Sequence, residues 1–244
     1  MKFLLVGLVL LFVLALGRMW RQRSCSSKDV ELVVSFCSYE PLWIAEAKQW
    51  LPRSTKITVY SKCEATYPNS TRIENVGREA HTFLHHIVTR YLTLADVTVF
   101  IMDSADSQQF KQMTLKDLLA NWCSQTGFYC AKVPLSVHYY LHRQRLAAFT
   151  MTSYKGSTFR EGKDESDTIP ARVRPFGAWF AKYIGGPFPK KYCGSAMMAV
   201  SKEVIRRRPL EFYQELLSQT AEGNNIEVGH YMERSWGAIF GNQA

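Results

Sequence analysis

The sequence lacks three short motifs that would each assign a chemistry. Its six cysteines include no CxxC pair, which argues against a zinc cluster. His81 and His85 are four residues apart, but Thr82-Phe83-Leu84 between them is not the HExxH of zinc proteases, so polar packing or substrate contact is favoured over zinc. Ser195 is not followed by the glycine that ends a nucleophile elbow, which argues against a serine hydrolase.

The chain also lacks internal repeats, low-complexity segments and long basic runs. Its formal net charge is +9 at pH 7, but four of the positive residues lie in the first 23 positions, which contain no acidic residue. The rest is therefore only mildly basic. This balance suits a protein that meets phosphates or anionic surfaces, and it does not indicate a nucleic-acid partner.

An apolar run at residues 3–16 sets the N-terminus apart. It is shorter than the roughly 20 residues that span a bilayer, so a cleaved signal peptide and a short membrane anchor are both open for residues 1–23. Arg18, Arg21 and Arg23 follow the run, and positive charge on that side opposes an anchor with a lumenal domain. Residues 24–29 form a predicted stem or linker, and residues 30–244 a single globular domain.

The cysteines and one sequon agree with the secretory pathway. The number of cysteines is even, which in an oxidising compartment predicts disulfides, and Cys123 and Cys130 are the best candidate pair because they are close in sequence. Asn69-Ser70-Thr71 is a glycosylation sequon in turn-like surroundings. The predicted location is the endoplasmic reticulum or Golgi membrane with a lumenal domain, or outside the cell if the N-terminal segment is cleaved.

Hydrophobic patterns predict alternating strands and helices after residue 30. Apolar runs of strand length occur at Val30–Phe36, Lys56–Tyr60, Val97–Met102 and Ala196–Val200. Helical spacing occurs at Leu42–Leu51, Glu79–Tyr91, Thr114–Trp122, Phe176–Ile184, from Lys202 after a Ser201 cap, from Pro209 to about Ala221, and at Glu227–Phe240. This order predicts a three-layer α/β fold, Rossmann-like, with a mainly parallel sheet and helices on both faces. Ligands in such folds bind beyond the carboxyl ends of the strands.

Polar side chains follow three of these predicted strands. Tyr39 and Glu40 come after the first strand, Lys62 after the second, and Asp103 and Asp106 after the third. A carboxylate pair at this place predicts a divalent metal, Mn²⁺ or Mg²⁺, held together with substrate phosphates. The alternative is that Asp103 and Asp106 only cap the next turn, a position that aspartate favours.

Two predicted helices add further candidates. Arg78 and Glu79 open one helix, where an arginine and the helix N-terminus can bind an anion, although Glu79 is favourable there on dipole grounds alone. His230 and Glu233 lie within about one turn of the last helix, and Glu233 is a candidate general base. A surface ion pair between Glu233 and Arg234 explains the same residues equally well.

The order of these motifs resembles an uncharacterised family, domain of unknown function 3431. The matching stretches are Val33-Val34 to Tyr39-Glu40 with Leu42-Trp43, Val59–Lys62, Asn75–Ile87, Pro175–Trp179, Ala199–Ser201 with Arg208-Pro209 and Phe212-Tyr213, and Glu233–Trp236 through Ile239–Gly241. The family is itself similar to nucleotide-sugar transferases of the GT-A fold. Two departures stand out: Met102–Asp106 replaces a Gln-Gly type turn, and Tyr39 replaces the asparagine expected before Glu40.

The resemblance implies a glycosyltransferase-like protein that moves a sugar from a nucleotide donor to a glycan or glycoprotein. Asp103 and Asp106 would then hold the metal, while Lys62, Arg78 and Glu79 would lie at the diphosphate. Tyr39 and Glu40 would line the nucleotide pocket, and Glu233, assisted by His230, would act as acceptor base in an inverting reaction. Two alternatives remain open: a non-catalytic glycan-binding or scaffold protein that keeps the fold, and a secreted hydrolase.

Overall fold

The computed structural model describes residues 27–131, 146–151, 168–187 and 193–241. Its framework is a six-stranded sheet with the order β3-β2-β1-β4-β6-β5. The strands are β1 (Val30–Phe36), β2 (Lys56–Ser61), β3 (Thr71–Arg72), β4 (Val97–Met102), β5 (Phe128–Cys130) and β6 (Met198–Ser201). Neighbours among β1 to β4 are parallel, and β6 runs antiparallel to both β4 and β5. The predicted mainly parallel sheet is confirmed.

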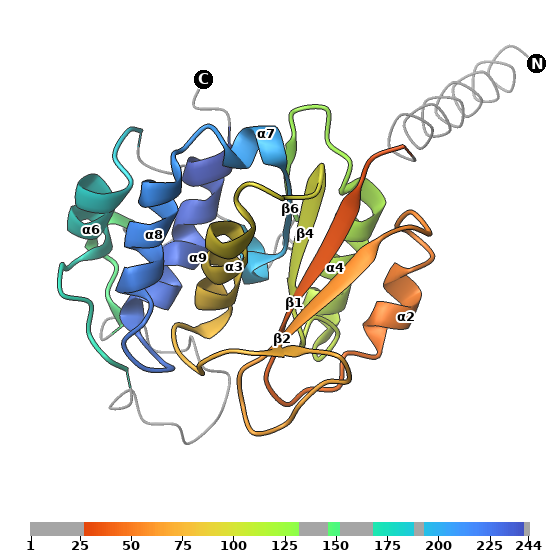
Figure 1. Ribbon diagram of the computed structural model, residues 1–244. Coiled ribbons are helices and arrows are strands. Elements are labelled where there is room, and N and C mark those ends of the chain that lie inside the picture. The colour runs from red at the N-terminus through yellow and green to blue at the C-terminus, as the bar shows by residue number, and fades with distance from the viewer. Residues whose placement is uncertain (1–26, 132–145, 152–167, 188–192, 242–244) are drawn as a thin grey trace, which may run out of the picture.

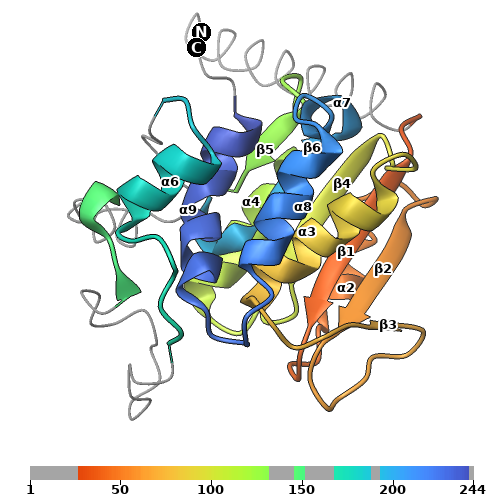
Figure 2. The same ribbon diagram turned by 60° about the vertical axis from the view of Figure 1, so that its left-hand side comes forward.

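Helices cover both faces of the sheet (Figures 1 and 2). One face carries α3 (Arg78–Arg90), α8 (Leu210–Gln219) and α9 (Glu227–Phe240), with α6 (Phe176–Tyr183) outside them, and the other face carries α2 (Trp43–Ala47) and α4 (Gln109–Asn121). Short turns of helix complete the described fold: α7 (Lys202–Ile205), η1 (Leu146–Ala148) and η4 (Gly194–Ala196). The arrangement is a three-layer, Rossmann-like α/β fold, as predicted.

The mainly apolar sequence of β1 reflects burial on both sides of the sheet. Leu32 and Val34 pack into the core under α2 and α4, whereas Val33 packs into the core under α3, α8 and α9. On the α3 side, Ser35 Oγ and Thr82 Oγ1 share a hydrogen bond of 2.9 Å. Because both faces are covered, β1 has no alternating polar face, which is typical of parallel sheets.

Several element bounds match the sequence prediction and others differ for local reasons. The bounds of β1, β4 and α9 match, and Ser201 Oγ caps α7 by accepting a hydrogen bond from the Val204 N–H at 3.3 Å. Helix α2 ends earlier than predicted, because its chain tightens into three-residue turns before Pro52. Helix α4 begins five residues earlier than predicted, because its first turn is largely exposed and has no apolar pattern.

A buried carboxylate at the start of α9 ties distant segments together. Glu227 is fully buried, and its two oxygens accept hydrogen bonds from the backbone N–H groups of Met151 and Ala171, each at 2.8 Å. Arg174 Nε lies 2.9 Å from the same carboxylate. This ion pair and its hydrogen bonds fix the start of α9 against the segments that precede α6.

Candidate functional site

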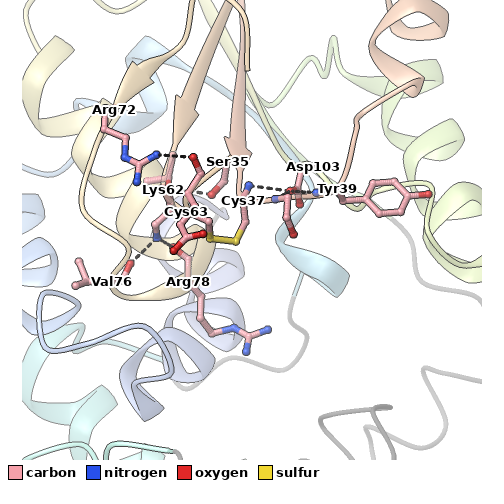
Figure 3. The surroundings of a disulfide bond; sticks show 12 residues. Ser35, Cys37, Tyr39, Lys62, Cys63, Arg72, Val76, Arg78 and Asp103 are labelled. Atoms are coloured by element: carbon pink, nitrogen blue, oxygen red, sulfur yellow. Dashed lines mark hydrogen bonds between the residues drawn. A yellow bond between two sulfur atoms is a disulfide. The ribbon is translucent and has the colours of Figure 1, made fainter. Parts of the chain in front are cut away.

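The three parallel strands β1, β2 and β4 end at the same edge of the sheet. The Lys62 N–H, just after β2, donates to the Phe36 carbonyl at 2.9 Å, and the Asp103 N–H, just after β4, donates to the Ser35 carbonyl at 2.9 Å. Figure 3 shows the residues of the three loops side by side at this edge. The structure therefore brings together the polar residues that follow these strands.

Asp103 organises the loop after β1. Its Oδ2 accepts hydrogen bonds from the backbone N–H groups of Cys37 (2.8 Å), Ser38 (3.1 Å) and Tyr39 (3.1 Å). Its backbone carbonyl accepts one from Trp43 Nε1 at 2.8 Å. The side chain is buried, and hydrogen bonds to a charged acceptor are the strong ones. The Asp103 carboxylate thus fixes the path of the loop from β1 to α2.

Tyr39 and Asp106 interact across the two neighbouring loops. Burial, then the charge of Asp106 and a hydrogen bond to its carboxylate, raise the pKa of Tyr39. Asp106 Oδ1 is buried and has no hydrogen-bond partner among the described residues. Tyr39 is 40% exposed and points away from the Cys37–Cys63 disulfide in Figure 3, and Glu40 beside it is exposed.

The carboxylate of Asp103 is partly committed to the protein itself. One carboxylate oxygen is already shared by three N–H groups. Across the described ranges, no group of three His, Cys, Asp or Glu side chains could hold a metal. Mg²⁺ requires near-octahedral oxygen ligands, and here the chain offers Asp106 and one oxygen of Asp103. Metal binding by this pair stays a prediction from the sequence.

Lys62 fixes the loop that leads into α3. The side chain is 4% exposed, and its Nζ donates to the backbone carbonyls of Val76 and Arg78 (Figure 3). Burial, opposed by the charge of Glu79 and reinforced by that of Arg78, lowers the pKa of Lys62 to about 8. Both contacts are therefore with the protein, and the predicted contact of Lys62 with a diphosphate stays a prediction.

A left-handed turn places Arg78 at the start of α3. Gly77 has φ +60°, and a Cβ there would lie 2.3 Å from the Thr220 carbonyl oxygen, so the position requires glycine. Arg78 also has a positive φ, of 55°. Its side chain is 37% exposed, with Nε 3.8 Å from Glu79 Oε2, and it points away from Lys62 in Figure 3. The guanidinium is thus presented beyond the strand ends, while Glu79 stays close to it.

Helix α9 brings the predicted base to the same edge. A Cβ at Gly229 would lie 3.2 Å from Arg78 Cδ, so the glycine allows α9 to approach the start of α3 closely. Burial and the charge of Glu79 raise the pKa of Glu233, against the lowering effects of Arg234, Arg78 and the Ser195 N–H. A carboxyl with a raised pKa in a group of charges is a functional-site candidate, because such pKa values suit general bases.

His230 lies one turn before Glu233 and is neutral. It is 4% exposed, and burial, followed by the charges of Arg78 and Arg234, lowers its pKa well below the usual value. Its Nε2 has no hydrogen-bond partner in the described part of the chain. Arg234 itself donates to the His230 carbonyl at 3.0 Å and lies over the Phe149 ring at 3.7 Å. Arg234 is therefore a packing residue as well as a neighbour of Glu233.

Sequence reasoning missed two residues of this site. Lys111 of α4 lies near the loop after β4. Burial lowers the pKa of Lys111, and the carboxylates of Glu79, Asp103 and Glu233 oppose that effect. Its place in the first turn of α4 lay outside the predicted helix, so no pattern pointed to it. Ser195 has a left-handed φ of 54°, and its N–H donates to Glu233. Nothing in the sequence signals that conformation, because serine rarely adopts it.

The cysteines pair differently from the sequence prediction. Cys130 forms a disulfide with Cys193, so the predicted pair of Cys123 and Cys130 is wrong. Cys37 pairs with Cys63, and Cys123 is disulfide-bonded as well. Cys130 ends β5, a strand that the sequence analysis did not predict, and β5 lies next to β6, just after Cys193. The prediction from proximity in sequence was wrong because both of these disulfides join segments that are distant in sequence and that the sheet brings side by side.

The membrane prediction concerns residues 1–23, which lie outside the described residues. No helix in the described ranges is long and apolar enough to cross a membrane. The disulfides agree with an oxidising compartment, which is the usual setting of structural disulfides.

Comparison with known proteins identifies the family. A search of curated proteins and a search of solved structures found no match. A family model described as "Protein of unknown function (DUF3431)" matches residues 32–244, which include the whole sheet edge described above and all the predicted site residues. The chain therefore belongs to the family described as protein of unknown function (DUF3431).

Proposed function

We propose that this protein is a glycosyltransferase of the secretory pathway that moves a sugar from a nucleotide donor to a glycan or glycoprotein. One observation carries the proposal: a carboxyl with a raised pKa, Glu233, lies with cationic side chains at the carboxyl ends of parallel strands. This edge is where α/β sheets bind nucleotides. The resemblance of the family to GT-A transferases supports the same reaction.

The proposed chemistry assigns a proton transfer to Glu233. In an inverting reaction, the Glu233 carboxylate takes the proton of an acceptor hydroxyl, and the hydroxyl oxygen attacks the anomeric carbon of the donor sugar. The bond from that carbon to the diphosphate oxygen breaks, and its electron pair leaves with the nucleoside diphosphate. Arg78 would neutralise the phosphates, and Tyr39 and Glu40 would border the nucleotide. His230, being neutral, would assist by orientation rather than by charge.

The location is part of the proposal. We place the domain in the lumen of the endoplasmic reticulum or Golgi, held by residues 1–23 if they are uncleaved. Asn69 of the sequon is exposed, in a turn next to the edge strand β3. Treating the expressed protein with a glycosidase specific for N-linked glycans should lower its apparent mass, and Asn69→Gln should remove that shift.

The reaction is tested by binding and then by transfer. Purified full-length protein is heated with UDP, GDP or CMP, because a ligand that binds the native state raises the melting temperature. The stabilising nucleotide identifies the donor class, and transfer from the matching nucleotide sugars is then measured. Glu233→Gln should retain nucleotide binding and lose transfer, while the exposed Glu211→Gln should keep both.

A non-catalytic glycan-binding protein is the second candidate. The role of Asp103 favours it, because that carboxylate fixes a loop instead of standing free for a ligand. If no nucleotide raises the melting temperature but immobilised glycans retain the protein, and Glu233→Gln binds them equally well, the transferase proposal is wrong.

A further inference from the structure

The ammonium group of Lys111 reaches the loop after β4 from helix α4. Its Nζ lies 3.3 Å from Ser104 Oγ and 3.4 Å from Ser107 Oγ. Both partners are neutral hydroxyls, and within the described residues no carboxylate lies within ion-pair distance of this nitrogen. A partly buried cation without a direct counter-ion can accept an anionic ligand at small rearrangement cost, because no ion pair has to be broken.

The other cations of the site are already engaged. The Lys62 ammonium is held by two backbone carbonyls, and the Arg78 guanidinium lies beside Glu79. The carboxylates of Glu79, Asp103 and Glu233 act on Lys111 from three different elements, α3, the end of β4 and α9. Lys111 thus lies within electrostatic range of three carboxylates of the site.

Lys111 reaches the loop that carries the predicted metal ligands. Asp103 and Asp106 were expected to hold a cation after β4, yet Asp103 is committed to three N–H groups of the chain. Lys111 Nζ contacts Ser104, the residue directly after Asp103. The Lys111 ammonium therefore supplies a positive charge at the loop where a metal ion was predicted.

We propose that Lys111 binds the donor diphosphate and neutralises it as it leaves, so that nucleotide binding needs no metal ion. This inference rests on the proposed function. The ammonium donates hydrogen bonds to phosphate oxygens. When the bond between the anomeric carbon and the diphosphate oxygen breaks, the electron pair stays on that oxygen, and the nearby positive charge stabilises it. Fixed charges of this kind act strongly in a partly desolvated site.

The test measures nucleotide affinity of the full-length protein in EDTA. UDP, GDP and CMP are titrated separately, by melting temperature and by calorimetry, into the wild type and the variants Lys111→Met, Lys111→Arg and Lys116→Met. Lys116 lies on the same helix and is exposed, which makes it a matched control. The melting temperature of each variant without nucleotide shows whether it is folded.

The expected result is that one nucleotide binds in EDTA and that Lys111→Met weakens it at least tenfold. Lys111→Arg keeps the charge and should retain most of the affinity, and Lys116→Met should bind like the wild type. Binding that appears only with Mn²⁺, or equal affinity of folded Lys111→Met and wild type, overturns the role of Lys111 while the transferase proposal stands. If no nucleotide binds with or without Mn²⁺, the transferase proposal fails and this inference falls with it.

Discussion

Replacing Asp103 tests whether it is a structural anchor or a metal ligand. The structure gives its Oδ2 three backbone N–H donors and leaves the side chain 7% exposed. A hydrogen bond to a charged group contributes about 1.5–3 kcal/mol, but Ser38 and Tyr39 are exposed, so their N–H groups can turn to water. We therefore expect Asp103→Ala to lower the free energy of unfolding by about 3 kcal/mol, well below the sum of three bonds.

Urea unfolding in EDTA measures this loss without any contribution from metal. Asp103→Asn is the matched variant, because its amide oxygen can accept the same N–H groups without the charge, and it should lose only about 1 kcal/mol. If both variants unfold like the wild type in EDTA, and the wild type alone gains stability when Mn²⁺ is added, the anchor role is refuted. Asp103 would then be a metal ligand, as the sequence pattern predicted.

Three further changes probe the parts of the fold that hold the site. Glu227→Gln replaces one fully buried oxygen, which accepts a backbone N–H, with an amide NH2, so urea unfolding should show a loss of roughly 1–3 kcal/mol. Gly77→Ala forces a Cβ to within 2.3 Å of the Thr220 carbonyl oxygen at a positive φ, so the melting temperature of this variant should fall by several degrees. An unchanged melting temperature would contradict the packing of α3 on the end of α8. Burial, followed by the charges of Lys62 and His85, lowers the pKa of His81 to about 4, so the unfolded chain binds the proton more readily than the folded chain. The free energy of unfolding should therefore fall by up to about 3 kcal/mol as the pH drops from 6.5 to 4. His81→Asn should reduce this dependence on pH.

The layout of the sheet could be predicted from the sequence because its signal is local. The strands β1 and β4 are buried on both faces, and they therefore appear as mainly apolar runs with clear ends. The short strands β3 and β5 were missed, because two or three residues carry no periodicity. The direction of β6 was not predicted either, since strand direction depends on the path of the whole chain.

The candidate site could be predicted only in part. The rule that parallel strands end at one edge placed Lys62 and Asp103 together, but it said nothing of their partners. Those partners are backbone groups: two carbonyls for Lys62 and three N–H groups for Asp103. Backbone groups are present at every residue, so no sequence pattern marks the ones that a side chain will bind. A lysine and an aspartate that hydrogen-bond to the loops therefore cannot be told apart, in the sequence, from residues that bind a substrate.

The disulfides Cys37–Cys63 and Cys130–Cys193 brace opposite sides of the same sheet edge. Cys37–Cys63 joins the loops after β1 and β2, beside Asp103 and Lys62 (Figure 3). Cys130–Cys193 joins the end of β5 to the segment that carries Ser195, whose N–H donates to Glu233. Strand β5 runs parallel to β4, because both are antiparallel to β6, so Cys130 lies at the edge where the other parallel strands end.

This placement predicts that loss of either disulfide has a similar effect on global stability, whereas the two losses have different effects on the site. Their sequence separations are 26 and 63 residues, so loop entropy assigns them about 3.5 and 4.3 kcal/mol respectively, a small difference. Replacing either pair by serines should therefore cost similar stability in urea. The Ser195 N–H, in the segment after Cys193, lowers the pKa of Glu233 against the raising effect of burial, so replacing Cys130 and Cys193 should shift the pH profile of transfer. Replacing Cys37 and Cys63 should instead weaken nucleotide binding and leave the profile in place. An equal effect of both double variants on binding and on the pH profile would show that the bonds act through global stability alone.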